Sequence, residues 1–494
     1  MNISKKLKEN IETLKSILKD CDDIIYRKIE IGDKDKTKAC LIFVDGLVDK
    51  SLISEYAIQV LLQCTESKDN MNINMIKTNF LDRISAESIA VHDVKEEEDL
   101  DKIVDEILVG ETALLVDNCK KGLILSSRGW PTRGIAEPET ETVVRGPRDG
   151  FGETMRFNTA LVRRRIRDPK MKLKATKVGR RSKTDIAIVY IEDIVNEKIL
   201  QEVMKRIDEI DIDSIGESST LEALIEDDYL SPFPQIESTE RPDAVAASLY
   251  EGRVGIIVDN TPFALIVPAT LGTLFQSTED YYSRWPITSV IRIIRIICAF
   301  LSVLAPALYI AISSFHPGLI PTVLTFYLAA SRVNVPFPVV IEAFLMEITI
   351  EILRESGTRI AGPIGSTIGI VGGLIVGQAA VEAGIVSPLM IIIVAITTMA
   401  SFALPNYQWA SGLRICRFAF MVLAAVLGLY GIMLGVVILF AHFAKLKSFG
   451  VPFASPYSGL GIKEGDLKDT LIKAPLQRLR FRPKFTFPRD KKRM

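Results

Sequence analysis

The chain has 494 residues and a formal net charge of −1, and 48% of its residues are hydrophobic. This length excludes a single small domain, and the near-neutral charge averages two different halves. The first 280 or so residues have a soluble composition, whereas residues 287–443 hold nearly all of the long runs of Ile, Leu, Val, Ala and Gly. We therefore expect a soluble domain followed by a membrane domain.

The first predicted element is an amphipathic helix within residues 1–30. This stretch lacks the apolar core and small-residue cleavage site of a signal peptide, so we expect a cytoplasmic N-terminal domain. Its apolar residues recur in steps of three and four, the spacing of a coiled-coil seam or of a helix packed on its own domain. The repeat is short, which favours the second interpretation. The stripe consists of Leu7, Ile11, Leu14, Leu18, Cys21 and Ile25.

An internal repeat follows this helix. ILVGETALLVDN at residues 107–118 matches SLYEGRVGIIVDN at residues 248–260. An apolar strand and an amphipathic stretch precede each match, so each half is expected to run strand, helix, strand, tight turn, strand. The sequence predicts two similar cytoplasmic α/β subdomains, at residues 31–130 and 131–280.

Both matches end in Val-Asp-Asn followed by a second apolar run, which predicts hairpin turns. Asp117 and Asp259 are therefore expected to be turn residues that bond their own backbone rather than catalytic acids. The sequence contains no GxSxG, HExxH or Walker motif and no GxGxxG after a strand, so we expect neither an enzyme nor a cofactor. The three histidines are scattered and the six cysteines form no CxxC pair, so we expect no metal site and reduced core thiols.

A basic stretch lies in the second subdomain, with fourteen Lys and Arg between Arg145 and Lys183 against three acids. Such a run suits nucleic acid, anionic lipid or an acidic partner. Only Phe151 and Phe157 are interleaved with it, so we expect no nucleic-acid partner. Anionic lipid or the acidic stretch at residues 209–228 is favoured. A merely solvated basic face is an equally open interpretation.

The membrane half, residues 281–447, is expected to begin at Tyr281, Tyr282 and Trp285, whose rings suit the headgroup layer. Arg292 and Arg295 are expected to snorkel to that interface. Residues 448–494 form a basic tail, predicted to be cytoplasmic by the positive-inside rule. Arg414 and Arg417 then fall awkwardly on the outer side of a four-span arrangement. The predicted apolar runs are 291–313, 364–383, 387–404 and 417–443.

Residues 336–359 form an unusual helix, apolar enough for a bilayer but rich in acids. Its aliphatic and Phe residues favour insertion by roughly 3 to 6 kcal/mol. Glu342, Glu347 and Glu351 would cost on the order of 8 to 10 kcal/mol against lipid, so they must face a hydrated or neutralised space. Two interpretations are equally open. The three acids line an ion pathway, or Glu347, Glu351 and Glu355 form a structural network with Arg354 and Arg359 at helical spacing.

A ribbon of small residues follows, with glycine at every fourth position. Absent side chains let helix backbones approach closely in a bilayer, so close packing is favoured over a pore lined by glycine backbone. A second ribbon, Ala424, Gly428 and Gly435, lies in the last predicted span. The first ribbon consists of Gly365, Gly369, Gly373 and Gly377.

Several passages between residues 145 and 456 resemble the A subunit of the GerA-type spore germination receptors. They include RGPRDGFGE, NTALVRRRIRDPKMK, TERPDAVAASLYEGRVGIIVDNTPF, EAFLMEITIEILRESGTR and SFGVPFASP. The resemblance implies a place in the inner spore membrane, beside a transporter-like B subunit and a lipoprotein C subunit. It also implies a cyclic homo-oligomer in contact with membrane lipid that forms a nutrient-gated cation channel.

The leading hypothesis is thus an α/β duplicated soluble domain followed by an all-α polytopic membrane domain that builds an ion path. One alternative is a secondary transporter, although transporter repeats lie in the membrane part and this repeat does not. The other is a non-conducting scaffold or accessory protein of the germination complex.

Overall fold

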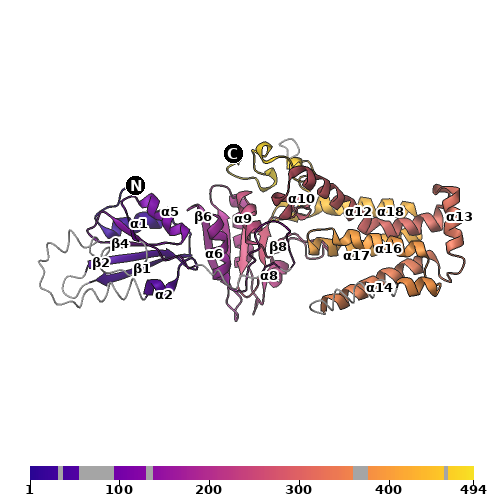
Figure 1. Ribbon diagram of the computed structural model, residues 1–494, viewed down its shortest axis with the longest axis horizontal. Helices are drawn as coiled ribbons and strands as arrows, with labels where there is room; N and C mark the ends of the chain where they lie inside the picture. The colour runs from indigo at the N-terminus through magenta and orange to yellow at the C-terminus, as the bar shows by residue number, and fades with distance from the viewer. Residues whose placement is uncertain are drawn as a thin grey trace, which may run out of the picture. The chain divides into compact units, whose positions relative to one another are not determined.

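The computed structural model describes residues 1–31, 37–54, 94–129, 137–138, 140–359, 377–460 and 466–493. The chain divides into two compact units (Figure 1), which are described separately. The first unit comprises Met1–Glu226, Ile236–Pro268 and Arg480–Met494, and the second comprises Asp227–Gln235 and Ala269–Leu479.

The first sheet is antiparallel, with the order β1-β2-β4-β5-β3. Residues alternate between its faces, as the pleat requires. Cys40, Ile42 and Leu115 pack under α1 and α5, which lie on the same side of the sheet in Figure 1. The stripe of α1 therefore contacts its own domain. The elements are α1 (Leu7–Ile17), β1 (Ile24–Ile31), β2 (Thr37–Val44), α2 (Lys50–Leu52), β3 (Val94–Glu97), α5 (Leu100–Val109), β4 (Thr112–Val116) and β5 (Gly122–Leu125).

The second sheet repeats this topology strand for strand, in the order β6-β7-β9-β10-β8. Helix α6 takes the place of α1 and α9 that of α5, so the repeat includes the N-terminal helix and strand that the matching peptides did not reveal. The predicted duplication is confirmed. The elements are α6 (Met155–Arg165), β6 (Met171–Val178), β7 (Thr184–Ile191), α7 (Glu197–Asp208), α8 (Ser218–Ile225), β8 (Glu237–Thr239), α9 (Pro242–Tyr250), β9 (Val254–Val258) and β10 (Ala264–Val267).

The Val-Asp-Asn peptides form hairpin turns, as predicted, with Asn118 and Asn260 at φ 64° and 66°. Their aspartates do not bond their own turns, which corrects that expectation. Asp117 accepts a hydrogen bond from the backbone N–H of Leu7 (2.9 Å), and Asp259 accepts one from that of Met155 (2.9 Å). Each acid thus satisfies an orphan donor at the start of α1 or α6 and ties that helix to its sheet.

The basic stretch splits between surface and interior. Arg180 and Arg181 pair with Asp211 and Asp213 of the acidic stretch, at exposed positions. Arg163 is fully buried and pairs with Asp23 of the first repeat. At least part of the excess charge therefore has a partner within the chain.

The second unit is helical and rich in apolar residues. Two of its described helices, α12 and α17, are long and apolar enough to cross a membrane. The predicted class, an α/β domain followed by an apolar helical domain, is confirmed. The elements are α10 (Leu271–Leu274), α11 (Glu279–Tyr282), α12 (Trp285–Phe315), α13 (Thr322–Ser331), α14 (Val339–Arg359), α16 (Pro388–Phe402), α17 (Tyr407–Leu427) and α18 (Leu429–Lys445), followed by the short strands β11 (Lys447–Ser448) and β12 (Val451–Pro452).

The apolar run at residues 417–443 is not one helix, which corrects the predicted last span and its small-residue ribbon. Gly428, at φ +58°, separates α17 from α18, and α18 folds back along α17. A Cβ added at Gly431 would lie 2.2 Å from the carbonyl oxygen of Leu423, and one at Gly435 would lie 2.8 Å from the Phe420 ring. These glycines let the two helices approach closely.

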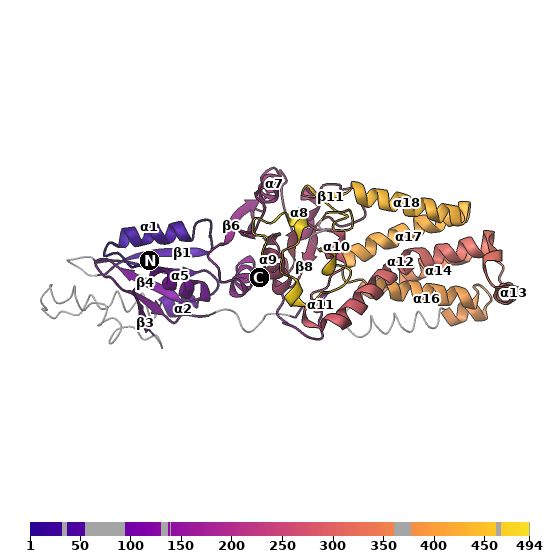
Figure 2. The same cartoon turned by 90° about the horizontal axis from the view of Figure 1, so that it is seen from above.

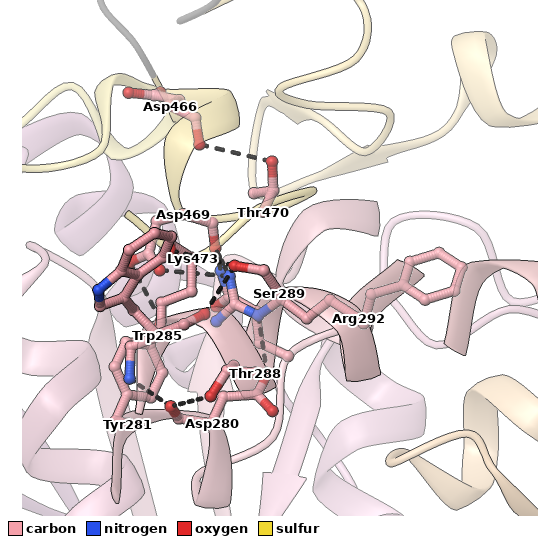
Figure 3. A network of polar contacts seen from close by, with 12 residues as sticks. Asp280, Tyr281, Trp285, Thr288, Ser289, Arg292, Asp466, Asp469, Thr470 and Lys473 are labelled. Carbon is pink, nitrogen blue, oxygen red and sulfur yellow. Dashed lines mark hydrogen bonds and ion pairs between the residues drawn. The ribbon is translucent and has the colours of Figure 1, made fainter. Parts of the chain in front are cut away.

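The start of α12 is tied to the C-terminal segment of the second unit (Figure 3). Arg292 donates to Asp280 (2.9 Å) and pairs with Asp469 (3.3 Å), and Lys473 donates to the Asp280 carbonyl. Arg295 also pairs with Asp280 (3.0 Å). The snorkelling prediction for both arginines is wrong: they expose 2% and 8% of their surface, because an acid lies within reach inside the fold.

Candidate functional site: a buried charge network on α14

Helix α14 carries the three acids singled out from the sequence and packs against α12, α16 and α17 (Figure 2). Glu342 and Glu347 are completely buried, and the side chain of Glu351 is 31% exposed. None of the three is bathed in bulk solvent. Burial of three carboxylates among apolar helices requires neutralising partners close by.

Glu347 is paired with Arg417 of α17, and neither side chain is exposed. Arg417 donates from Nη1 to the Glu347 carboxylate and from Nε to the carbonyl oxygen of Ser302 in α12 (2.7 Å). The pair therefore joins three helices at one point. Charge-assisted bonds of this type are the strong ones, so the pair fixes the position of α14 in the unit.

Glu342 belongs to α14, and its carboxylate lies against the start of α16. One of its oxygens accepts two hydrogen bonds from Ser387, the residue that caps this helix: 2.6 Å from the backbone N–H and 2.5 Å from the hydroxyl. The positive end of the α16 dipole favours a carboxylate there. The other oxygen lies 3.5 Å from Nη2 of Arg332, which follows α13.

Glu351 lies at the more accessible end of the network. Its carboxylate is 3.5 Å from Arg354 of its own helix and 3.8 Å from Arg414 of α17. The Arg354 guanidinium also lies 5.1 Å from the centre of the Phe402 ring and donates to Ser401 (3.3 Å). The network thus extends from two sealed acids to one that is partly open to solvent.

Several polar atoms of this network have no hydrogen-bond partner in the part of the chain that the structure describes, although they are buried. Buried polar groups are nearly always satisfied, so unpartnered atoms indicate water, an ion or a group from another molecule. Each acid faces at least one arginine, but the network leaves hydrogen-bonding groups unsatisfied. The atoms are Glu342 Oε2, Glu347 Oε1, Glu351 Oε1, Arg354 Nε and Nη1, and Arg417 Nη2.

The sequence indicated the acids but missed most of their partners. Within-helix pairing was expected, and the Glu351–Arg354 contact is of this kind. The remaining partners, Arg332, Arg414 and Arg417, come from other parts of the unit. The awkward placement of Arg414 and Arg417 was the available signal, because charges in neighbouring apolar helices tend to pair with one another.

Of the first glycine ribbon, Gly365, Gly369 and Gly373 lie outside the described residues. Gly377 is buried, and a Cβ added there would lie 3.8 Å from two side-chain carbons of Ile391. That distance is an ordinary contact, so the packing around Gly377 within one copy of the chain does not by itself demand glycine.

Among the described residues, no three His, Cys, Asp or Glu side chains gather as metal ligands would. Cys21, Cys40, Cys119, Cys298 and Cys416 are free thiols. Burial raises the pKa of the Cys40 thiol to about 11, which makes it a poor nucleophile at neutral pH.

The chain is similar to known proteins of one family. A model of the "Bacillus/Clostridium GerA spore germination protein" family matches residues 12–485. Spore germination protein KA of Bacillus subtilis is 44% identical over 99% of this chain and 88% of its own length. Spore germination protein B1 of the same organism is 42% identical over 99% of both chains.

One solved structure is also similar, the N-terminal domain of the A subunit of the Bacillus megaterium spore germinant receptor GerK3. It is 33% identical, and the match covers 55% of this chain and 98% of that domain with a TM-score of 0.43.

Proposed function

Because the chain belongs to the Bacillus/Clostridium GerA spore germination protein family, we propose that it is the A subunit of a spore nutrient receptor and that copies of it enclose an ion path. The family acts in spore germination and is not a known family of enzymes. Membership implies work with other receptor subunits, and the apolar helices α12 and α17 imply association with a membrane.

The observation that carries the ion path is the incomplete network on α14. Six of its buried atoms have no hydrogen-bond partner within the described chain, although three of them lie at ion-pair distance from an opposite charge. Unsatisfied buried groups point to water, an ion or a group from another molecule. Water and a cation, or a second copy of the chain, would complete Glu347 and Glu351. Rings of acidic side chains select cations in channels, so a cyclic arrangement of copies would place several such carboxylates around one path.

The proposed gate is the Glu347–Arg417 pair. While it is closed, the Glu347 charge is cancelled and α12, α14 and α17 are held together. A partner in its nutrient-bound state would favour an arrangement in which the pair separates or is hydrated, and so shift the population toward the conducting form. Gly365, Gly369, Gly373 and Gly377 would pack copies closely around the path.

The proposed setting is the inner spore membrane, with transporter-like B and lipoprotein C subunits as partners. The first unit and the C-terminal segment would be cytoplasmic, since residues 445–494 hold thirteen Lys and Arg against four acids. The nutrient would be sensed by the partner, and this chain would transmit the signal.

The test is ion flux from vesicles that hold the full chain, with and without its partners. Neutralising Glu342, Glu347 and Glu351 together should abolish nutrient-triggered cation release. Glu355→Gln, an exposed acid on the same helix, is the matched control and should leave release unchanged. Normal release from the triple variant would instead favour a non-conducting scaffold, and saturable uptake of a substrate would favour a transporter.

A further inference from the structure

The helical unit contains an apolar hollow whose lining includes none of the charged residues of the α14 network. It has a volume of about 450 Å³, within the range of about 300 to 1,000 Å³ typical of small-molecule sites. Its walls come from α12, α17, α18 and the segment after β12, and they are almost entirely carbon. Protein interiors are close-packed, so an apolar space of this size is a candidate ligand site.

The lining of the hollow indicates the kind of occupant. Nearly all of the surface that it presents is apolar, so the occupant should be largely hydrocarbon. Trp409 of α17 lines the hollow and is 1% exposed, so its indole ring reports on what fills the space.

The hollow has the dimensions and access of a lipid site. Its lining residues run from Ile296 to Leu304 along α12 and from Val436 to Ala444 along α18. Each stretch is about 12 Å long at about 1.5 Å per residue, close to half of a hydrocarbon core of about 30 Å. Two lining rings, Phe300 and Phe440, are 52% and 53% exposed on these helices, so the hollow borders the surface that lipid would cover.

Two lysines follow the last lining residue of α18 in the sequence. Lys445 comes directly after Ala444, and Lys447 comes two residues after Lys445. Both are exposed, and neither pairs with an acid in the part of the chain that the structure describes. An anionic headgroup held there is favoured by roughly 1 kcal/mol for each cation near the membrane surface.

We infer that the hollow between α12, α17 and α18 holds one acyl chain of an anionic phospholipid. The phosphate of the lipid lies near Lys445 and Lys447. The inference rests on the membrane location in the proposed function but not on ion conduction.

The experiment uses the full chain in vesicles of phosphatidylglycerol and phosphatidylcholine, with Trp130 and Trp285 replaced by Phe so that only Trp409 fluoresces. Phosphatidylglycerol brominated in mid-chain should quench Trp409, although the residue is buried. Ala299→Phe, which fills the hollow, should abolish this quenching. Val426→Phe is the matched control, because Val426 is 67% exposed on α17 and does not line the hollow. It should leave the quenching unchanged.

Headgroup preference and lipid retention provide a second measurement. Replacing Lys445 and Lys447 with Gln should weaken the preference for phosphatidylglycerol by about fivefold for each charge removed. Native mass spectrometry of the otherwise unaltered chain should find one retained phospholipid, which keeps the inference testable if Ala299→Phe fails to fold.

Three results would overturn the inference: no quenching of Trp409 by the brominated lipid, equal quenching in Ala299→Phe, or quenching by aqueous acrylamide, which would mean that water fills the hollow. The first result would also arise if a side chain of a second copy filled it. Ion flux is not measured, so failure here leaves the proposed channel function standing.

Discussion

Two buried ion pairs with the same types of residue differ in how completely they are satisfied. In the first unit Arg163 donates to both oxygens of Asp23 (3.0 Å each) and to the carbonyl oxygen of Met171 (2.8 Å). In the second unit the Glu347–Arg417 pair is equally buried, but Glu347 Oε1 and Arg417 Nη2 have no partner among the described residues. Burial alone therefore does not reveal whether a pair is a finished structural link.

The difference follows from what surrounds each pair. Asp23 and Arg163 join the two repeats of the first unit, where the backbone carbonyl of Met171 at the start of β6 accepts the remaining hydrogen bond from the guanidinium. Glu347 and Arg417 lie between helices, where most carbonyls are used within the helix. Arg417 reaches the carbonyl of Ser302 in α12, which Pro306 four residues later cannot occupy because it has no N–H. Side chains, water or ions must complete that pair, which leaves it open to change.

The largest effect is expected from breaking the fully hydrogen-bonded Asp23–Arg163 pair. Arg163→Met leaves Asp23 buried without a cation and should lower the free energy of unfolding of the first unit by roughly 3 to 5 kcal/mol. Denaturant unfolding of the detergent-solubilised full chain measures this loss. Asp23→Leu combined with Arg163→Met should recover most of it, because no charge is then left unpaired. A loss below about 1 kcal/mol in the single variant would show that the pair is hydrated after all.

Glu141 should make the stability of the first unit depend on pH, because its carboxylate accepts from a hydroxyl rather than from a guanidinium. Glu141 accepts from the Thr239 hydroxyl (2.6 Å), while Arg241 donates to Asp243 and to the Glu141 backbone carbonyl. Burial raises the pKa of Glu141 to about 7, and the nearby acids Glu237 and Glu240 add to the shift. The folded unit therefore binds a proton that the unfolded chain releases above its ordinary pKa of about 4.3.

The folded protein holds more protons than the unfolded chain between about pH 4.3 and 7, so its stability falls as the pH rises through that window. We expect the first unit to lose about 2 kcal/mol of stability between pH 5 and 8 from this group. Glu141→Gln mimics the protonated form and should remove that part of the pH dependence. Unfolding of the two proteins at both pH values is the measurement. Parallel pH profiles would contradict the raised pKa.

Weakening the Glu347–Arg417 pair should lower stability less than Arg163→Met does, and it should affect cation release more. Glu347→Gln should lower the stability of the helical unit by about 1 to 2 kcal/mol, less than Arg163→Met, because Glu347 is already partly unsatisfied. In the proposed channel it should also raise nutrient-independent cation leak, since the link between α14 and α17 is weakened. Melting in detergent and flux from vesicles measure the two effects. A loss as large as that of Arg163→Met, with no leak, would make this pair a structural link too.

Local patterns were enough to predict the repeat, the hairpin turns and the neutralised surroundings of the α14 acids. The register of the sheets was beyond sequence reasoning, because β2 pairs with β4 and β5 with β3 across long separations. The partners of Glu342 and Glu347 lie in other elements, so no spacing rule could find Ser387 or Arg417. The break at Gly428 was hidden in a continuous apolar run, where period and hydropathy do not distinguish one long helix from two short ones.

The smallest effect is expected at the surface, where Arg180 pairs with Asp211 and both side chains are about two-thirds exposed. Here water and salt compete with the partner, and holding two long side chains in one geometry offsets most of the attraction. Arg180→Gln should therefore leave the unfolding transition unchanged at physiological salt, in contrast to Arg163→Met in the same basic stretch. Unfolding of both variants at low and high salt tests this contrast, because only an exposed pair should respond to ionic strength. If Arg180→Gln destabilised the unit as strongly as Arg163→Met, burial would not be what separates a strong pair from a weak one.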